Sequence, residues 1–162
     1  MKNTKRELSH LSEKNLPRMI DVSEKSKTHR TAISAAKIHL GEELAQILKK
    51  TKSTKKGPVI QTAVIAGIQG AKKTSELIPM CHPLTLDNVE IEINIKGEYA
   101  IVIATVKTED RTGVEMESLT AVSISALTIY DMCKSINKSI KIESIQLLKK
   151  TGGKSGNFFQ NI

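Results

Sequence analysis

The chain has 162 residues, of which 39% are hydrophobic and 26% charged, a composition that suits one compact domain with its own core. Aromatic residues make up only 2% and tryptophan is absent, which counts against the aromatic stacking platforms of proteins that bind single-stranded nucleic acid. The net charge of +8 predicts acidic partners, such as phosphorylated small molecules, nucleic acid or an anionic surface, although basic charge of this size is often only a solvated face.

Cysteine usage and hydropathy indicate a protein of the reducing cytoplasm. The two cysteines, Cys81 and Cys133, lie inside apolar segments, and the sequence shows neither a disulfide framework nor a signal peptide. No apolar run approaches the roughly 20 residues that span a bilayer. We therefore expect a soluble cytoplasmic protein with no membrane partner.

The first half of the chain predicts a strand and two helices. Residues 31–40 alternate small or apolar side chains with polar ones, as in a strand. An acidic first turn, apolar residues at helical spacing and a basic end predict a helix over 42–50. A basic loop over 51–56 then precedes a second helix that starts at Gly57-Pro58.

The second half predicts a hairpin, a long helix and a last strand. Residues 78–84 contain two prolines and form a stiff connector that cannot be helical throughout. Strict alternation over 89–95 predicts a half-exposed strand, paired through a turn with a strand over 99–106. A charged loop over 107–112 leads to the long helix, and a strand over 141–149 follows it. This mixture of helices and hairpin strands is typical of the α+β class.

The chain shows no internal repeat, no low-complexity tract and no composition shift that would mark a second domain. We expect a mobile N-terminal arm over 1–16, one α+β domain over 17–157 and a C-terminal tail over 158–162.

The long helix after Gly113 carries the most informative pattern. From Ser118 to Met132 its only charged residue is Asp131, so this segment should be largely buried, and burying an ionised carboxylate costs several kcal/mol unless the group is paired. Glu117 and Asp131 lie about 40° apart around the helical axis, on one polar side. Asp131 and Lys134 are three residues apart and can touch.

Two interpretations of Asp131 remain open from spacing alone. An ion pair at a helix end is common and weak. The alternative is a site, because desolvation and a neighbouring lysine would move the pKa of Asp131 in opposite directions, and such arrangements favour acid–base chemistry.

Other patterns carry weaker signals. His82 lies in an apolar connector, where a histidine is more often packed than catalytic, and it points away from Cys81, so a thiolate–imidazole pair is not expected. Cysteines and histidines show no paired-ligand spacing for zinc.

The glycine-rich stretch 152–156 lacks the earlier glycine and the following helix of a P-loop, but its amides and Lys154 could hold an anion. Lys56, before a helix start, is a similar candidate, although a solvated lysine is more common.

Four long motifs stand in order along the chain: KKTSELIPMCHPL (72–84), GVEME (113–117), ALTIYDMCK (126–134) and GGKSG (152–156). Together with MIDVS and IAGIQ earlier in the sequence, they resemble the molybdenum cofactor biosynthesis protein C family, the cyclic pyranopterin monophosphate synthases. The resemblance runs from about residue 10 to 157.

The resemblance implies a ferredoxin-like α+β domain, with an antiparallel sheet packed against helices. It implies a homohexamer, a trimer of dimers, with active sites at subunit interfaces. The implied activity is that of a lyase that converts (8S)-3',8-cyclo-7,8-dihydroguanosine 5'-triphosphate, a GTP-derived substrate, to cyclic pyranopterin monophosphate and pyrophosphate. No redox cofactor and no protein-bound metal are implied, although Mg²⁺ could accompany the triphosphate.

The family's functional residues fall on named positions of this chain. Its central acid–base group falls on Asp131, Lys134 and Lys56. Its substrate-binding residues fall on Met80, Cys81, His82, Glu115, Met116, Glu117 and Lys154. In this interpretation His82 and the two glutamates orient the purine-derived ring, and Lys154 holds phosphates.

Two other classes of protein fit parts of the pattern. A non-enzymatic basic protein that binds nucleotides or nucleic acid would have an affinity that falls steeply with salt, but the low aromatic content and the charges on an apolar helix disfavour it. A polar helix side that serves only as a subunit interface would lose its oligomeric state when Asp131 is changed to Asn. We therefore expect a small-molecule triphosphate, and not nucleic acid, as the partner.

Overall fold

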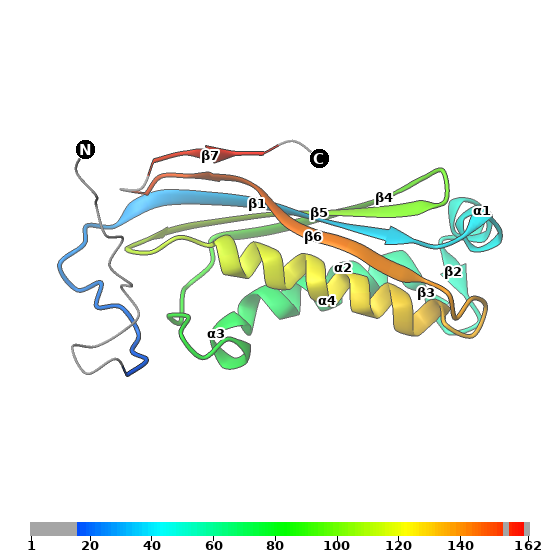
Figure 1. Cartoon of the computed structure of the whole chain (residues 1–162), viewed down its shortest axis with the longest axis horizontal. Coiled ribbons are helices and arrows are strands. Elements are labelled where there is room, and N and C mark those ends of the chain that lie inside the picture. The colour runs from blue at the N-terminus through cyan, green and yellow to red at the C-terminus, as the bar shows by residue number, and fades with distance from the viewer. Residues whose placement is uncertain (1–15, 154–155, 161–162) are drawn as a thin grey trace, which may run out of the picture.

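One antiparallel sheet with helices on one of its faces forms the body of the protein (Figure 1). This computed structural model describes residues 16–153 and 156–160. In chain order, the elements are β1 (Thr28–His39), α1 (Glu42–Thr51), β2 (Ser53–Thr54), β3 (Gly57–Pro58), α2 (Val59–Lys72), α3 (Thr74–Leu77), β4 (Asn88–Lys96), β5 (Tyr99–Asp110), α4 (Glu115–Cys133), β6 (Lys141–Thr151) and β7 (Phe158–Phe159).

The strands of the main sheet follow the order β4-β5-β1-β6-β7, and each neighbouring pair is antiparallel. β2 and β3 form a separate two-stranded ribbon. The architecture belongs to the α+β class, as predicted. Among the described residues, no helix is both long and apolar enough to cross a membrane.

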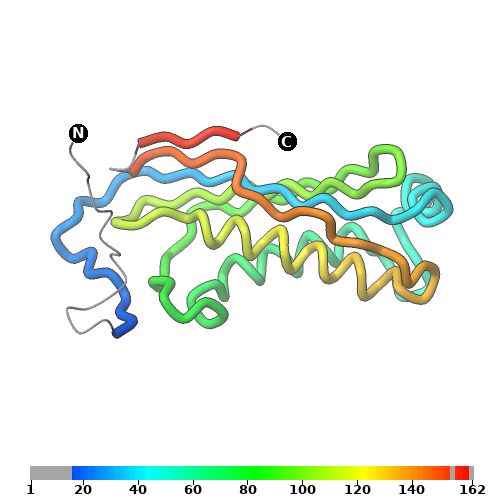
Figure 2. The backbone as a smooth tube through the Cα atoms, viewed as in Figure 1, coloured from blue at the N-terminus to red at the C-terminus, as the bar shows by residue number. Residues whose placement is uncertain are grey.

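The two ends of the molecule hold different parts of the chain. Figure 2 shows the segment before β1, the connector after α3 and the start of α4 together at one end. α1, the β2–β3 ribbon and the end of α4 lie at the opposite end. α4 has 19 residues, which corresponds to a length of about 28 Å. This helix therefore links the two ends.

α2 and α4 lie close together because a glycine stands at their contact. A Cβ on Gly67 would overlap Ser125 Oγ and would lie 2.9 Å from the carbonyl oxygen of Ala121. Ser125 Oγ donates a hydrogen bond of 2.9 Å to the Ala63 carbonyl, so this buried hydroxyl is satisfied. The close contact fixes α4 against α2 along its middle turns.

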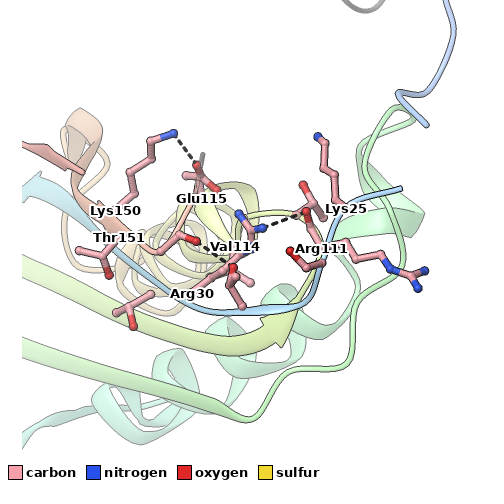
Figure 3. A pocket seen from close by; sticks show the side chains of 14 residues that line it. Lys25, Arg30, Arg111, Val114, Glu115, Lys150 and Thr151 are labelled. Carbon is pink, nitrogen blue, oxygen red and sulfur yellow. Dashed lines mark hydrogen bonds and ion pairs between the residues drawn. The ribbon is translucent and has the colours of Figure 1, made fainter. Parts of the chain in front are cut away.

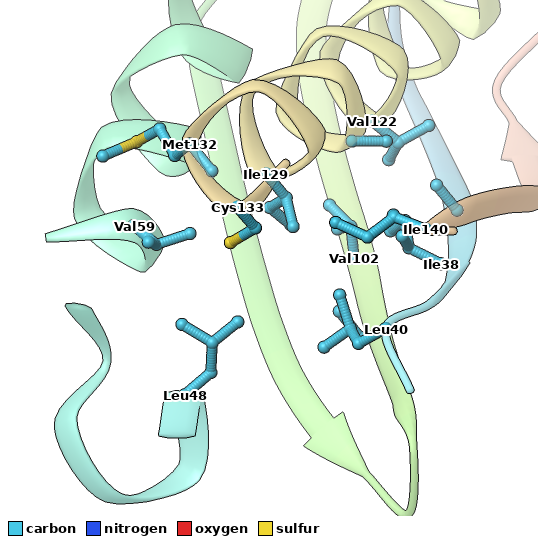
Figure 4. Packing of buried hydrophobic residues seen from close by; sticks show 14 of the residues in the cluster. Ile38, Leu40, Leu48, Val59, Val102, Val122, Ile129, Met132, Cys133 and Ile140 are labelled. Atoms are coloured by element: carbon cyan, nitrogen blue, oxygen red, sulfur yellow. The ribbon is translucent and has the colours of Figure 1, made fainter. Parts of the chain in front are cut away.

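The main hydrophobic core lies between this helix pair and the sheet (Figure 4). Val122 and Ile129 of α4 are fully buried there and pack with side chains from β1 and β5. Burial of each such aliphatic side chain contributes about 1.5–3 kcal/mol. The other large members include Ile38, Leu40, Leu44, Leu48, Val59 and Val102.

The predicted charged loop over 107–112 is wrong in most of its length. β5 continues to Asp110, because its last residues pair with the start of β1, where Thr28 faces Asp110. Thr108 is buried there and donates a hydrogen bond of 2.6 Å to the Thr85 carbonyl. Charged side chains on the exposed face of this strand concealed its alternation.

Short elements account for the other differences. The predicted start of the second helix at Gly57-Pro58 is wrong, because both residues pair with β2 and Gly57 has a φ of 110°, which is not helical. Phe158–Phe159 of the predicted tail forms β7 against β6. Two-residue strands leave no periodic signal in a sequence.

The division into an arm, one domain and a tail stays a prediction, and residues 1–15 lie outside the described part of the chain.

Candidate functional site

A pocket of about 230 Å³ lies where three segments meet at the first turn of α4. The segment before β1 forms one wall, the connector after α3 forms a second, and the residues that begin α4 form the third. Its lining residues are Ile20, Val22, Lys25, Met80, Cys81, His82, Leu84, Thr112, Gly113, Glu115, Met116 and Glu117. The structure thus brings together six predicted substrate-binding residues, from Met80 through Glu117. We refer to this pocket as the carboxyl pocket.

Glu117 is the buried acid of the carboxyl pocket. Only 4% of the residue is exposed. The pKa of Glu117 is raised to about 7, mainly by burial and to a smaller extent by the nearby Glu115 carboxylate, whereas a hydrogen bond from the backbone N–H of Glu117 opposes the rise. Burial and the Glu117 charge also raise the pKa of the Cys81 thiol. Glu117 can therefore donate or accept a proton near neutral pH.

A second pocket, of about 360 Å³, adjoins the first (Figure 3). We call it the basic pocket, because four cationic side chains line it: Lys25, Arg30, Arg111 and Lys150. Glu115 is its only acidic lining residue within the described part of the chain. Lys25, Thr112, Gly113 and Glu115 line both pockets, so the two spaces share one wall.

Ion pairs and hydrogen bonds organise the wall of the basic pocket. Lys150 Nζ lies 3.2 Å from Glu115 Oε1, and both side chains are about 70% buried (27% and 29% exposed). Arg30 donates from Nε to the Asp110 carbonyl at 2.8 Å and from Nη2 to the Arg111 carbonyl at 3.0 Å. Figure 3 shows the Lys150 side chain directed at Glu115, the first residue of α4. Arg30 thus holds the end of β5, from which Arg111 follows.

Glycines allow the chain to line the basic pocket closely. A Cβ on Gly113 would overlap the Glu115 carboxylate. Gly152 has a φ of +92°, and its Cβ would overlap the His29 carbonyl oxygen. Thr28 Oγ1 donates a hydrogen bond of 2.8 Å to the Gly152 carbonyl, which ties the end of β6 to the start of β1.

His82 is packed and hydrogen-bonded. Its Nε2 lies 2.8 Å from the carbonyl oxygen of Ile20, in the segment before β1. Because a carbonyl oxygen only accepts hydrogen bonds, Nε2 is the donor. His82 and Cys81 both line the carboxyl pocket.

The predicted acid–base group forms a compact cluster at the other end of α4. Asp131 Oδ1 lies 2.8 Å from Lys134 Nζ, and Oδ2 lies 3.1 Å from Lys56 Nζ. Lys56 Nζ also donates a hydrogen bond of 2.7 Å to the Asp131 carbonyl. Thr54 of the β2–β3 ribbon donates a hydrogen bond of 3.1 Å to the Met132 carbonyl, which holds the ribbon, and with it Lys56, against the helix end.

Asp131 is not buried within a single chain, contrary to what the apolar sequence around it predicts. Its side chain is 58% exposed. Hydrogen bonds from Lys134 and Lys56 lower the pKa of Asp131, and burial, which opposes them, has the smallest influence. The same pair with Asp131 raises the pKa of Lys134. The apolar side chains around Asp131 in sequence face the core, whereas Asp131 itself projects from the last turn; the buried acid of the helix is Glu117.

The predicted site residues therefore fall into two groups within one chain. Glu117 and Asp131 are separated by about 21 Å along the axis of α4. Met80, Cys81, His82, Glu115, Met116 and Glu117 lie at one end, and Lys56, Asp131 and Lys134 lie at the other. Lys154 lies outside the described residues.

Sequence reasoning did not name the cations of the basic pocket as site residues. One signal was the basic run over 25–30, which continues into the start of β1, but its position opposite the end of β5 follows only from the β1–β5 register. Lys150 directly follows the predicted strand over 141–149, and nothing in the sequence distinguished it from Lys149.

An α+β domain with a cation-lined pocket beside a buried carboxyl fits the class of proteins that act on phosphorylated small molecules. The MoaC family model matches residues 19–153, and the chain belongs to the MoaC family.

Curated relatives agree with this assignment over nearly their whole length. A cyclic pyranopterin monophosphate synthase of Campylobacter jejuni (serotype O:6, strain 81116) is 54% identical over 156 residues, which cover 95% of this chain and 99% of the relative. The synthase of Campylobacter lari is 52% identical over the same shares. That of Helicobacter pylori (strain 26695) is 50% identical over 153 residues, or 93% of this chain and 96% of the relative.

Proposed function

We propose that this protein is a cytoplasmic lyase of molybdenum cofactor biosynthesis. It converts (8S)-3',8-cyclo-7,8-dihydroguanosine 5'-triphosphate to cyclic pyranopterin monophosphate and pyrophosphate, and its relatives are named after the first of these two products. The observation that carries the proposal is the shared wall between the basic pocket and the carboxyl pocket. The substrate has two matching parts, a triphosphate and a hydrogen-bonding ring system, joined through a ribose.

The basic pocket suits the triphosphate. Lys25, Arg111 and Lys150 supply cationic donors, and Arg side chains bind phosphate oxygens through two parallel hydrogen bonds. Arg30 already donates to two backbone carbonyls, so its main contribution is to position the pocket wall. Lys154 follows Gly153 in the chain and is proposed as a further phosphate ligand. Mg²⁺, where it takes part, would arrive on the phosphates, and we propose no redox cofactor.

The carboxyl pocket suits the ring. Met80, Cys81 and Met116 provide a mainly apolar lining, and Glu117 provides one buried polar group. With a pKa of about 7, the Glu117 carboxyl can accept a hydrogen bond from a ring N–H or donate one to a ring nitrogen. This capacity fits a ring that must open and close again during the reaction.

The reaction requires proton transfers during ring opening and reclosure. A ribose-derived oxygen then attacks the α-phosphate, and pyrophosphate leaves. We assign the proton transfers to Lys56, Asp131 and Lys134. Lys134 is a cation at neutral pH, and its ion pair with Asp131 holds the ammonium group in place as a hydrogen-bond donor toward negative charge that develops on the substrate.

The two groups of residues come together when a second copy of the chain is present. Lys134 is too far from the pockets of its own chain, because α4 separates the groups by about 21 Å. A two-fold axis that sets two α4 helices antiparallel would bring the acid–base group of one copy to the pockets of its partner. Exposed Ile65 and Leu127, 59% and 56% exposed on α2 and α4, support a protein contact on the helix layer. The ferredoxin-like fold and the homohexamer, a trimer of such dimers, remain proposals from the family resemblance.

Mixing two inactive variants tests the activity and the shared site together. Glu117→Ala removes the pocket carboxyl, and Asp131→Asn disables the acid–base group. Each variant alone should release little pyrophosphate from the cyclised substrate. Co-expressed copies should regain activity, because about a quarter of the sites would combine two intact halves in a two-fold dimer with random pairing.

Two outcomes would count against the proposal in different ways. If the wild-type protein releases no pyrophosphate and forms no cyclic pyranopterin monophosphate, the proposed activity is wrong. If the wild type is active but co-expression restores nothing, each site is built within one chain. Co-expression of Glu117→Ala with Lys150→Ala is the matched control, since both residues belong to the same half and no intact site can form.

A further inference from the structure

The segment over 18–25 forms one wall of the carboxyl pocket without being part of the sheet or the helices. Three of its residues, Ile20, Val22 and Lys25, are partly buried, and these three line the pocket. The other five are exposed. The segment therefore presents one face to the pocket and the other to solvent.

The segment has its own local turns. Ser23 N–H donates a hydrogen bond of 2.8 Å to Asp21 Oδ1, and Lys25 N–H donates one of 3.0 Å to the Val22 carbonyl. These bonds stiffen the segment but do not attach it to the domain. A short segment with only such local bonds opens more often when its attachment to the domain is lost.

His82 provides that attachment. The bond from His82 Nε2 to the Ile20 carbonyl is the only hydrogen bond between the segment over 18–25 and the rest of the described chain. Pro79 and Pro83 stiffen the backbone on both sides of His82, and a 3.0 Å hydrogen bond from Cys81 N–H to the Ile78 carbonyl closes a turn just before it. The connector thus holds the imidazole at a fixed place opposite Ile20.

We propose that His82 is a positioning residue that fastens the segment over 18–25 as a wall of the site, and that its ring does not transfer protons in the reaction. Nε2–H is already bonded to the Ile20 carbonyl, and proton transfer through Nε2 would break this bond. The inference rests on the proposed function and assigns His82 a role different from the ring-orienting one that the resemblance implies.

The consequence for substrate binding follows from Lys25. This residue lines both pockets and belongs to the fastened segment. Loss of the His82 bond would release Lys25 together with Val22 and Ile20, so phosphate and ring contacts would weaken at once. Because the acid–base group lies elsewhere, binding should suffer more than the chemical step.

Three variants at one position test the role of the ring. His82→Ala removes the donor. His82→Gln carries an amide N–H near the place of Nε2, and His82→Asn is the matched control, because its amide lies near the place of Nδ1 and cannot reach Ile20. Backbone hydrogen exchange of peptides over 18–25, with α1 as the internal reference, measures the attachment. Steady-state pyrophosphate release gives KM and kcat.

We expect the Ala and Asn variants to exchange the 18–25 amides about tenfold faster, as loss of one net hydrogen bond allows, with α1 unchanged. Their KM should rise about tenfold and their kcat should fall by less than about threefold. His82→Gln should recover slow exchange, with a KM nearer to that of the wild type than to that of the Ala variant. A side chain that cannot shuttle protons would then support turnover.

Three results would overturn the inference. Normal exchange of the segment in the Ala variant would show that His82 does not fasten it. Slow exchange in the Gln variant with kcat as low as in the Ala variant would show that the ring itself acts on the substrate. A KM in the Gln variant no lower than in the Asn variant would exclude the Nε2 donor.

If His82→Ala fails to fold, the Gln and Asn pair decides the question. Hydrogen exchange needs no substrate, so failure of the proposed activity would remain distinct from failure of the attachment.

Discussion

Lys150 Nζ lies 3.2 Å from Glu115 Oε1, and this ion pair joins the last long strand to the first turn of α4. The pair stands in the wall between a basic pocket and a pocket with a buried carboxyl. An incoming phosphate would compete with Glu115 for the same ammonium group. The pair therefore holds Lys150 in place before substrate arrives, at a modest cost when the ammonium changes partner.

Replacing Lys150 with Gln should weaken substrate binding much more than folding. Loss of one charge-assisted hydrogen bond to phosphate corresponds to a KM about ten to a hundred times higher. The partly exposed pair with Glu115 contributes about 1 kcal/mol or less to the free energy of unfolding. KM for the cyclised substrate and urea unfolding measure the two effects.

Lys149→Gln is the matched control for this change. Lys149 is the neighbouring residue on β6, but its Nζ lies 5.5 Å from the centre of the Phe159 ring and it does not line the basic pocket. An equal rise of KM in both variants would mean that net charge, and not the place of Lys150, governs binding.

Gly152→Ala should destabilise the protein and deform the basic pocket. The residue has a φ of +92°, and a Cβ there would overlap the His29 carbonyl oxygen. The backbone conformation alone costs about 1–2 kcal/mol for an L-residue, and the overlap adds to this cost. Gly97→Ala isolates the first contribution, since Gly97 has a φ of +57° with no atom within 4 Å of its Cβ. Equal unfolding free energies for the two variants, measured in urea, would contradict the overlap.

The sequence predicted elements with clear periods and missed features that arise from pairing between distant segments. The hairpin of β4 and β5 was predicted because its apolar side chains alternate over many residues. The basic pocket was not, because Lys150 reaches it only through the register that sets Lys150 opposite Ala32 on β1. No local pattern contains that information.

Asp131 shows a second limit of reasoning from sequence. Its neighbours in the chain are apolar, but burial of a helical residue depends on the direction of its own side chain. Ile129 and Met132 face the core, with 0% and 7% exposure, whereas Asp131 is 58% exposed between them. Glu117 was placed correctly on the helix, but its burial follows from the contact of the first turn of α4 with the connector.

Glu117 should make the stability of the protein depend on pH. The pKa of its carboxyl is about 7 in the folded chain and 4.5 when exposed, so the folded state binds more protons than the unfolded state between these values. Stability should therefore fall as pH rises through this window, by about 3 kcal/mol if the whole pKa difference is expressed. Glu117→Gln should remove most of this fall. The stability of the variant relative to the wild type should therefore be higher at pH 8 than at pH 5.

Urea unfolding of both proteins at pH 5 and pH 8 measures this linkage. Glu92→Gln is the control, because Glu92 is exposed on β4. This change should alter the free energy of unfolding by the same amount at pH 5 and at pH 8. If the Glu117→Gln variant loses the same stability between pH 5 and pH 8 as the wild type, another group causes the dependence.

Asp131→Asn should reduce kcat by about a hundredfold or more, the usual contribution of a positioned acid–base group, and should leave the fold intact. In the wild-type chain, the Asp131 carboxylate accepts hydrogen bonds from Lys56 and Lys134 and raises the pKa of Lys134. Without it, the two lysines would repel each other and leave their places. Asp87→Asn, an exposed acid in the connector before β4, is the control. Size-exclusion chromatography separates catalysis from assembly: an Asp131→Asn protein that dissociates would show that the charge serves the subunit contact, whereas an intact oligomer with low kcat assigns it to the reaction.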